Sequence, residues 1–154
     1  YEMVDLGYNY RITDFQCALG LSQLKKLDKW LKKRRDIAHR YDAAFNEHSF
    51  VTPLSRKLDI EHAYHLYVVK IKDQDGGINR DVVFKKMREK GIFVNVHYIP
   101  VHLHPFYVRQ FSTGPGLCPK AEKAYKEIVS LPMFPSLSAD QIRMVIEALR
   151  SSRS

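Results

Sequence analysis

Residues 13–45 read TDFQCALGLSQLKKLDKWLKKRRDIAHRYDAAF, and this stretch decides the expected fold. Thr13 and Gln16 are spaced as in a capping box, in which the two side chains satisfy free backbone N–H groups at a helix start. Proline is absent and Gly20 is the only glycine in the stretch. Apolar residues recur at helical spacing, at Leu24, Leu27, Leu31, Ala38, Tyr41 and Phe45. The sequence therefore predicts one helix of about 45–50 Å. A helix of this length is too long to be buried within so small a chain, so we expect it to connect two bodies.

The residues after this helix predict an α+β body with a small sheet. Strands are expected at 63–72, 92–98 and 130–134, where aromatic and β-branched residues cluster. Helices are expected over 80–90, after Asn79 as a cap, over 119–128, and from the Ser138 capping box to about Leu149. Residues 53–62 are interpreted as a connection and residues 100–118 as a long loop, while residues 151–154 should be a frayed tail.

The overall charge suits an acidic partner. Lys and Arg total 25 against 17 Asp and Glu, a formal net charge of +8, which fits nucleic acid, anionic lipid or a phosphorylated small molecule. No apolar run approaches the roughly 20 residues of a membrane-spanning helix. The two cysteines are too few for a disulfide framework, so a cytoplasmic location is expected.

A basic run, residues 25–35, has two interpretations. It contains seven Lys and Arg residues and could bind the phosphates of a nucleic acid. On a helix, however, these residues point in several directions, and Asp28 and Asp36 are placed for ordinary ion pairs along the helix. No recognised nucleic-acid motif accompanies the run, so a solvated helix face is favoured.

Three histidines, His97, His102 and His104, lie close together in the sequence. They could ligate a metal ion, but no carboxylate or cysteine lies between them and two belong to the expected loop, so no metal site is predicted. His97 and Tyr98 could equally end a strand that faces a polar ligand or simply pack at the surface, and the residues alone leave both interpretations open. No nucleophile elbow, P-loop or dinucleotide fingerprint is present.

Several segments, in order, resemble the DegT/DnrJ/StrS family of sugar-nucleotide aminotransferases. Residues 7–24 are similar to the family segment G-x-N-[YF]-R-[ML]-[ST]-[DE]-[IL]-Q-[AC]-A-x-G-L-x-Q-L, and residues 33–41 to K-R-x-x-I-A-x-x-Y. Residues 97–102 resemble H-Y-x-P-[VIL]-H, and residues 121–122 and 130–132 resemble its A-E and S-L-P elements. The likeness covers nearly the whole chain and is greatest to the pseudaminic-acid branch.

This resemblance implies a fold-type-I enzyme that uses pyridoxal 5′-phosphate. Such an enzyme transfers an amino group from glutamate to C4 of a nucleotide-linked 4-keto-6-deoxy sugar, here UDP-linked, for surface glycans. Residues 1–45 would then be the end of the large domain and the connecting helix, and residues 46–150 the small C-terminal domain, with a mostly antiparallel sheet and helices on one side. The Schiff-base lysine would precede Tyr1, so this fragment alone is predicted to be inactive.

The resemblance also assigns site residues. Asn9 and Arg11 would contact the cofactor, with Asn9 reaching the cofactor phosphate or the substrate of the neighbouring subunit in a homodimer with shared active sites. The sugar nucleotide would be bordered by His97, Tyr98, Ile99, Pro100 and His102. No nucleic acid, membrane or metal is expected. The alternative hypothesis is a non-catalytic basic α+β module that binds a nucleotide or nucleic acid.

Overall fold

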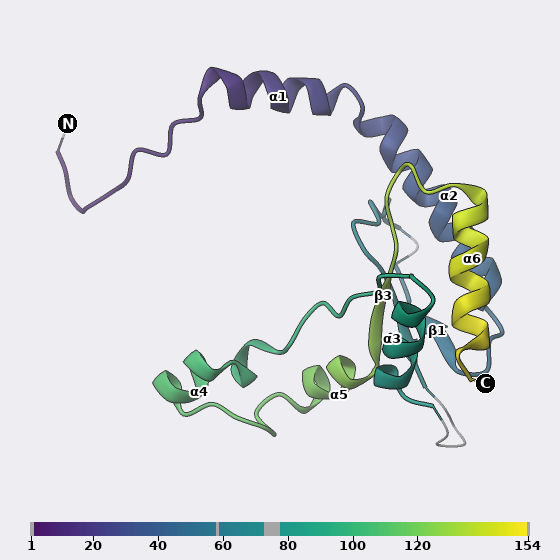
Figure 1. The fold of residues 1–154 in the computed structure, drawn as a ribbon. Helices are drawn as coiled ribbons and strands as arrows, with labels where there is room; N and C mark the ends of the chain where they lie inside the picture. Colours follow the sequence, from purple (N-terminus) through teal and green to yellow (C-terminus); the bar gives the residue numbers. More distant parts are fainter. Residues whose placement is uncertain (1, 58, 73–77, 154) are drawn as a thin grey trace.

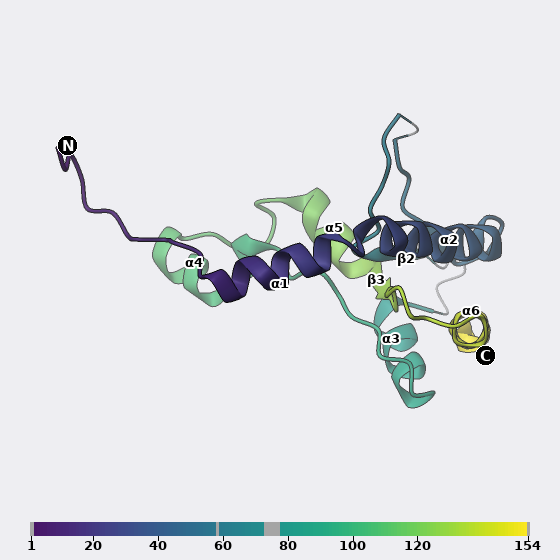
Figure 2. The same cartoon turned by 90° about the horizontal axis from the view of Figure 1, so that it is seen from above.

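The computed structural model describes residues 2–57, 59–72 and 78–153, and it shows an elongated arm joined to a packed body (Figure 1). An extended lead-in and helix α1 (Asp14–Leu24) form the arm, and helix α2 (Leu27–Phe45) runs from the arm into the body. Seen from above, the lead-in lies at the opposite end of the molecule from the C-terminus (Figure 2).

The prediction of one continuous helix over residues 13–45 is wrong at a single point. The capping box at Thr13 and Gln16 is present, but α1 ends before Lys25 and α2 begins at Leu27. The Lys26 N–H bonds the Gln23 carbonyl three residues back, at 3.0 Å, instead of the carbonyl four residues back. This tighter turn ends α1, and α2 leaves in a new direction (Figure 1).

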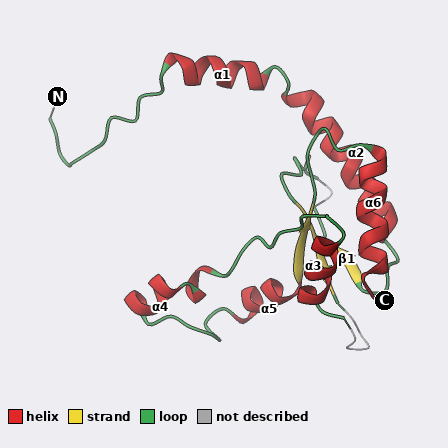
Figure 3. Ribbon diagram, in the orientation of Figure 1, coloured by secondary structure: helices red, strands yellow, loops and turns green. Residues whose placement is uncertain are grey.

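A three-stranded antiparallel sheet lies at the centre of the body, in the order β1 (Val51–Pro53), β2 (Tyr67–Ile71), β3 (Ile128–Leu131) (Figure 3). Val51 pairs with Ile71, and Tyr67 with Leu131. Along β2 the side chains alternate between buried and half-buried, as expected for a strand with one face on the core.

Strand boundaries account for most of the differences from the prediction. Strand β1 was not predicted, and only its last residue, Pro53, lies in the stretch interpreted as a connection. The strand expected over 63–72 begins only at Tyr67, because Tyr64 has a φ of 46°, which interrupts an extended chain. The strand expected over 130–134 begins at Ile128 and stops at Leu131, since Pro132 has no N–H for a ladder.

The strand predicted over 92–98 is wrong. In this stretch the described chain has one isolated bridge, between Asn95 and Ser130, and the Val94 N–H turns back onto the Ile92 carbonyl at 3.0 Å. The loop expected over 100–118 likewise contains two short helices, η1 (Val101–Leu103) and α4 (Pro105–Phe111).

The remaining helices agree with the prediction. Helix α3 (Arg80–Glu89) is capped by Asn79 and followed by Gly91 at a φ of 74°, a conformation suited to glycine. Helix α5 (Pro119–Glu127) leads into β3, and α6 (Ala139–Arg150) starts at the predicted Ser138 capping box. Residues 151–153, expected to fray, form a short 3₁₀ helix, η2 (Ser151–Arg153), in which Ser152 is fully buried.

Helices α2, α3 and α6 share one hydrophobic core with the sheet. Their buried side chains join those of β2 and β3 in a single cluster, so these helices cover the same face of the sheet, as predicted. Two side chains of α2 also hold the chain just after β3: the Tyr41 hydroxyl donates to the Pro132 carbonyl at 3.0 Å, and Arg34 donates to the Met133 carbonyl at 3.0 Å.

Candidate functional site

The predicted cofactor contacts, Asn9 and Arg11, lie on the extended lead-in. Both residues are exposed, and the lead-in lies well away from the sheet in both views (Figures 1 and 2). This chain therefore does not bring Asn9 or Arg11 to the predicted substrate residues around His97.

His97 is half-buried and is held by the end of the sheet. Its Nδ1 lies 2.8 Å from the Ser130 hydroxyl. Two residues earlier, Asn95 exchanges backbone hydrogen bonds with Ser130, at 2.8 and 3.2 Å. Tyr98 follows with an exposed ring, edge-on to the imidazole at 4.6 Å between centroids. The segment therefore combines a fixed imidazole with an exposed phenol.

His102 faces inward, onto a carboxylate. Its side chain is buried, and Nε2 lies 2.9 Å from Oε1 of Glu122 on α5. The same oxygen accepts the backbone N–H of Gly116 at 2.8 Å and that of Cys118 at 3.4 Å. These bonds, led by the one from His102, hold the pKa of Glu122 below its ordinary value. The Glu122 carboxylate thus links His102 to the loop before α5.

The three histidines do not converge on a shared point. His97 bonds Ser130, His102 bonds Glu122, and His104 is exposed. Among the residues that the structure describes, no group of three or more His, Cys, Asp or Glu side chains is arranged to hold a metal ion.

The chain from Tyr98 through η1 and α4 to Leu117 carries many exposed apolar side chains, which we call the α4 surface. Ile99 and Val101 lead into it, and Pro100 between them is half-buried. The exposed aromatic and aliphatic side chains along this stretch of chain are Tyr98, Ile99, Val101, Phe106, Tyr107, Val108, Phe111 and Leu117. The predicted substrate residues Tyr98, Ile99 and Pro100 therefore border a surface that this chain itself does not cover.

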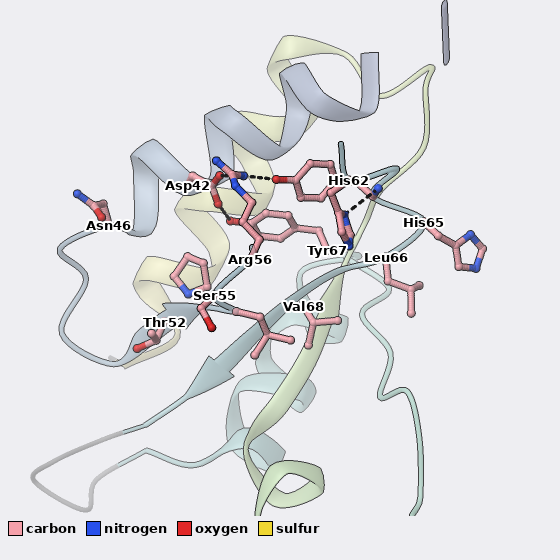
Figure 4. A pocket seen from close by; sticks show the side chains of 13 residues that line it. Asp42, Asn46, Thr52, Ser55, Arg56, His62, His65, Leu66, Tyr67 and Val68 are labelled. Atoms are coloured by element: carbon pink, nitrogen blue, oxygen red, sulfur yellow. Dashed lines mark hydrogen bonds and ion pairs between the residues drawn. The ribbon is translucent and has the colours of Figure 1, made fainter. Parts of the chain in front are cut away.

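A cavity of about 700 Å³ lies elsewhere, between α2, β1 and the segment before β2 (Figure 4). Four of its polar side chains are paired with one another: Asp42 accepts the Tyr67 hydroxyl at 2.6 Å and the Arg56 guanidinium at 2.9 Å, and Arg56 also bonds the Tyr64 hydroxyl. Burial, followed by the contact with Asp42, raises the pKa of Tyr67. None of the predicted site residues lines this cavity.

Part of the basic run has a structural role. The Arg34 guanidinium donates to the backbone carbonyls of Tyr64 at 2.9 Å, His65 at 3.2 Å and Met133 at 3.0 Å. Arg35 forms an ion pair with Glu61 at 2.6 Å. The lysines of the run are exposed, which agrees with a solvated helix face.

Sequence reasoning missed two contacts that shape this site. The Ser130 hydroxyl and the Glu122 carboxylate orient His97 and His102, across 33 and 20 residues of chain. The only indication in the sequence was that Glu122 and Ser130 lie in the A-E and S-L-P elements of the family resemblance.

The fold is similar to those of a class of solved structures, the sugar aminotransferases, one of them in its PLP form. The model of the DegT/DnrJ/EryC1/StrS aminotransferase family matches residues 1–150, and the chain belongs to this family.

Individual relatives agree with this assignment. The spore coat polysaccharide biosynthesis protein SpsC of Bacillus subtilis (strain 168) is 41% identical over 152 residues, which are 97% of this chain and 39% of SpsC. Among solved structures, PseC of Helicobacter pylori, an aminotransferase involved in the biosynthesis of pseudoaminic acid, is 30% identical with a TM-score of 0.86 over 98% of this chain and 40% of PseC. The PLP form of Spr1654 from Streptococcus pneumoniae is 29% identical with a TM-score of 0.87, over 99% of this chain and 38% of that chain. The chain thus spans about two fifths of the length of these relatives.

Across residues 2–57, 59–72 and 78–153, no helix combines the length and apolar character needed to cross a membrane.

Proposed function

We propose that this chain is the C-terminal part of an aminotransferase that uses pyridoxal 5′-phosphate to move an amino group from glutamate to C4 of a nucleotide-linked 4-keto-6-deoxy sugar. The observation that carries the proposal is the match to PseC, which extends over 98% of this chain. The 41% identity to SpsC, a polysaccharide biosynthesis protein, supports a role in the synthesis of surface glycans.

The residues of this chain fit the edge of a cofactor site and not its centre. Asn9 and Arg11 carry N–H donors suited to a phosphate, and both are exposed, so they are free to reach a neighbouring subunit of a homodimer. In contrast, no lysine among the described residues is buried, and none lines the cavity beside Asp42. The cofactor, when bound, supplies the electron sink for the amino transfer. The lysine that anchors it would belong to another part of the enzyme.

The substrate side of the site is assigned to the segment after the Asn95 bridge. His97 and Tyr98 offer hydrogen-bonding groups to a sugar, while Ile99 and Pro100 border it by backbone and apolar contact. His102 contributes by holding the Glu122 carboxylate, which also accepts the backbone N–H groups of Gly116 and Cys118. The net charge of +8 suits the diphosphate of the substrate and the phosphate of the cofactor.

The experiment compares two proteins, the full-length enzyme and this chain alone. Cofactor absorbance and amination activity are measured for each, first in a cytoplasmic extract and then after purification. The full-length protein should carry a borohydride-reducible absorbance in the near-visible range and convert a UDP-linked 4-keto-6-deoxy-N-acetylhexosamine to its 4-amino product with glutamate. This chain alone should do neither. A full-length protein that stays colourless with added pyridoxal phosphate would overturn the proposal.

A further inference from the structure

We propose that Ser130 is a positioning residue for the sugar nucleotide, acting through His97. The inference rests on the proposed function, which places His97 at the sugar-nucleotide site. Ser130 itself is only 4% exposed, so it does not meet a ligand directly.

Ser130 holds the His97 segment at two points. Its hydroxyl lies 2.8 Å from Nδ1 of the imidazole, and its backbone N–H and carbonyl both pair with Asn95. The backbone bridge sets where the segment leaves the sheet, and the side-chain bond sets the rotation of the ring. One residue therefore fixes both the position and the orientation of His97.

The support behind Ser130 is rigid. Ser130 pairs with Val68 on the central strand β2. Immediately after β3, the Pro132 and Met133 carbonyls accept bonds from Tyr41 and Arg34 of α2. A hydroxyl carried on such a frame is fixed before a ligand arrives, which lowers the entropy cost of binding.

The other ring nitrogen of His97 remains available. Among the described residues, no hydrogen-bond partner occurs for Nε2, and the ring is half-buried. Because a serine hydroxyl can donate or accept, Ser130 can satisfy Nδ1 in either neutral tautomer and leave Nε2 for the sugar nucleotide. Without the hydroxyl, Nδ1 is left unpaired and the ring loses its preferred orientation.

The test uses the full-length enzyme and separates its two half-reactions. We expect Ser130→Ala to raise KM for the UDP-linked 4-keto sugar about tenfold, with kcat within about twofold, as for a lost binding hydrogen bond. The glutamate half-reaction, followed by the loss of cofactor absorbance, should stay within about twofold of wild type. Ser130→Thr keeps a hydroxyl and should recover most of the affinity.

The matched control is Ser152→Ala. This change removes another buried hydroxyl, which bonds the Ala148 carbonyl at 2.7 Å, and it should leave KM for the sugar nucleotide unchanged.

A double mutant distinguishes positioning from a general structural effect. In a His97→Ala background, Ser130→Ala should add no further increase in KM, because its effect passes through the imidazole. The inference is overturned if His97→Ala or Ser130→Ala leaves KM unchanged, if the two effects simply add, or if both half-reactions fall together. If the wild-type enzyme is active and the variants give any of these results, only the inference about Ser130 is overturned and the proposed function is retained. A wild-type enzyme without amination activity overturns the proposed function and this inference with it.

Discussion

The arm and the body carry similar kinds of apolar residues but use them differently. No side chain of α1 is buried, and Phe15, Leu19 and Leu24 are 90%, 62% and 64% exposed. In the body, residues of the same types, such as Phe45 and Leu149, are essentially inaccessible to water. The difference shows that the body completes its own core, whereas the apolar residues of the arm need a surface that this chain does not supply.

The length comparison suggests where that surface lies. The chain spans about two fifths of its relatives, and the arm contains the family segment from Gly7 to Leu24. We therefore expect α1 to pack on the rest of a longer enzyme.

The largest effect should come from two leucines chosen as a pair. Leu149→Ala empties a fully buried site and should lower the free energy of unfolding of the body by about 2–5 kcal/mol. Leu19→Ala, on the exposed arm, should change it by less than about 0.5 kcal/mol in this chain. Urea unfolding followed by circular dichroism measures both.

The two leucines should behave more alike in the full-length enzyme. If α1 is buried there, Leu19→Ala should cost about 2 kcal/mol or more, approaching the loss at Leu149. A Leu19 substitution that remains neutral in the full-length protein would show that the arm stays exposed and would contradict its assignment to a large domain.

A smaller effect is expected within the basic run, where α2 crosses from arm to body. Arg34→Met removes three hydrogen bonds to the Tyr64, His65 and Met133 carbonyls and should cost about 2–3 kcal/mol in the free energy of unfolding. Arg34→Lys should recover only part, because an ammonium lacks the planar fork of a guanidinium. Lys32→Met, at an exposed position of the same run, is the control and should be nearly neutral. Equal losses at Arg34 and Lys32 would contradict the structural role of Arg34.

Local signals predicted the helices well. The Thr13 and Ser138 capping boxes, the Asn79 cap and Gly91 each act through bonds within a few residues, so their sequence patterns were sufficient. The tight turn at Lys25 and Lys26 has no glycine or proline to mark it, so the helix break was missed.

Strands and site contacts depend on distant residues, and prediction was weaker there. Strand β1 has three residues and exists because it pairs with β2, while residues 92–98 have strand-like composition but only one bridge partner. The sequence suggested His97 and His102 as functional residues. It did not show that Ser130 and Glu122 orient them, because those contacts form only after β3 and α5 are in place.

The smallest effect concerns pH and the closed core of the body. The His48 ring lies between Phe45 and Phe50, with centroid distances of 6.1 and 4.7 Å, and its Nδ1 is buried without a hydrogen-bond partner. Burial, followed by the charges of Arg150 and Arg153, lowers the pKa of His48 below its ordinary value of 6.5. As pH falls below 6.5, the unfolded chain therefore binds a proton that the folded chain does not, and stability decreases.

This linkage can be measured by urea unfolding at pH 7, 6 and 5. The wild-type free energy of unfolding should fall with pH across this range, and His48→Leu, which cannot take up a proton, should reduce that fall. His39→Leu removes an exposed histidine and should keep the wild-type slope. Below pH 4.5 the free energy of unfolding of every variant should fall further. In this range Glu122 takes up a proton in the unfolded chain, whereas in the folded chain the bond from His102 lowers its pKa and keeps it ionised. An unchanged slope in His48→Leu would contradict the burial of this ring against Phe45 and Phe50.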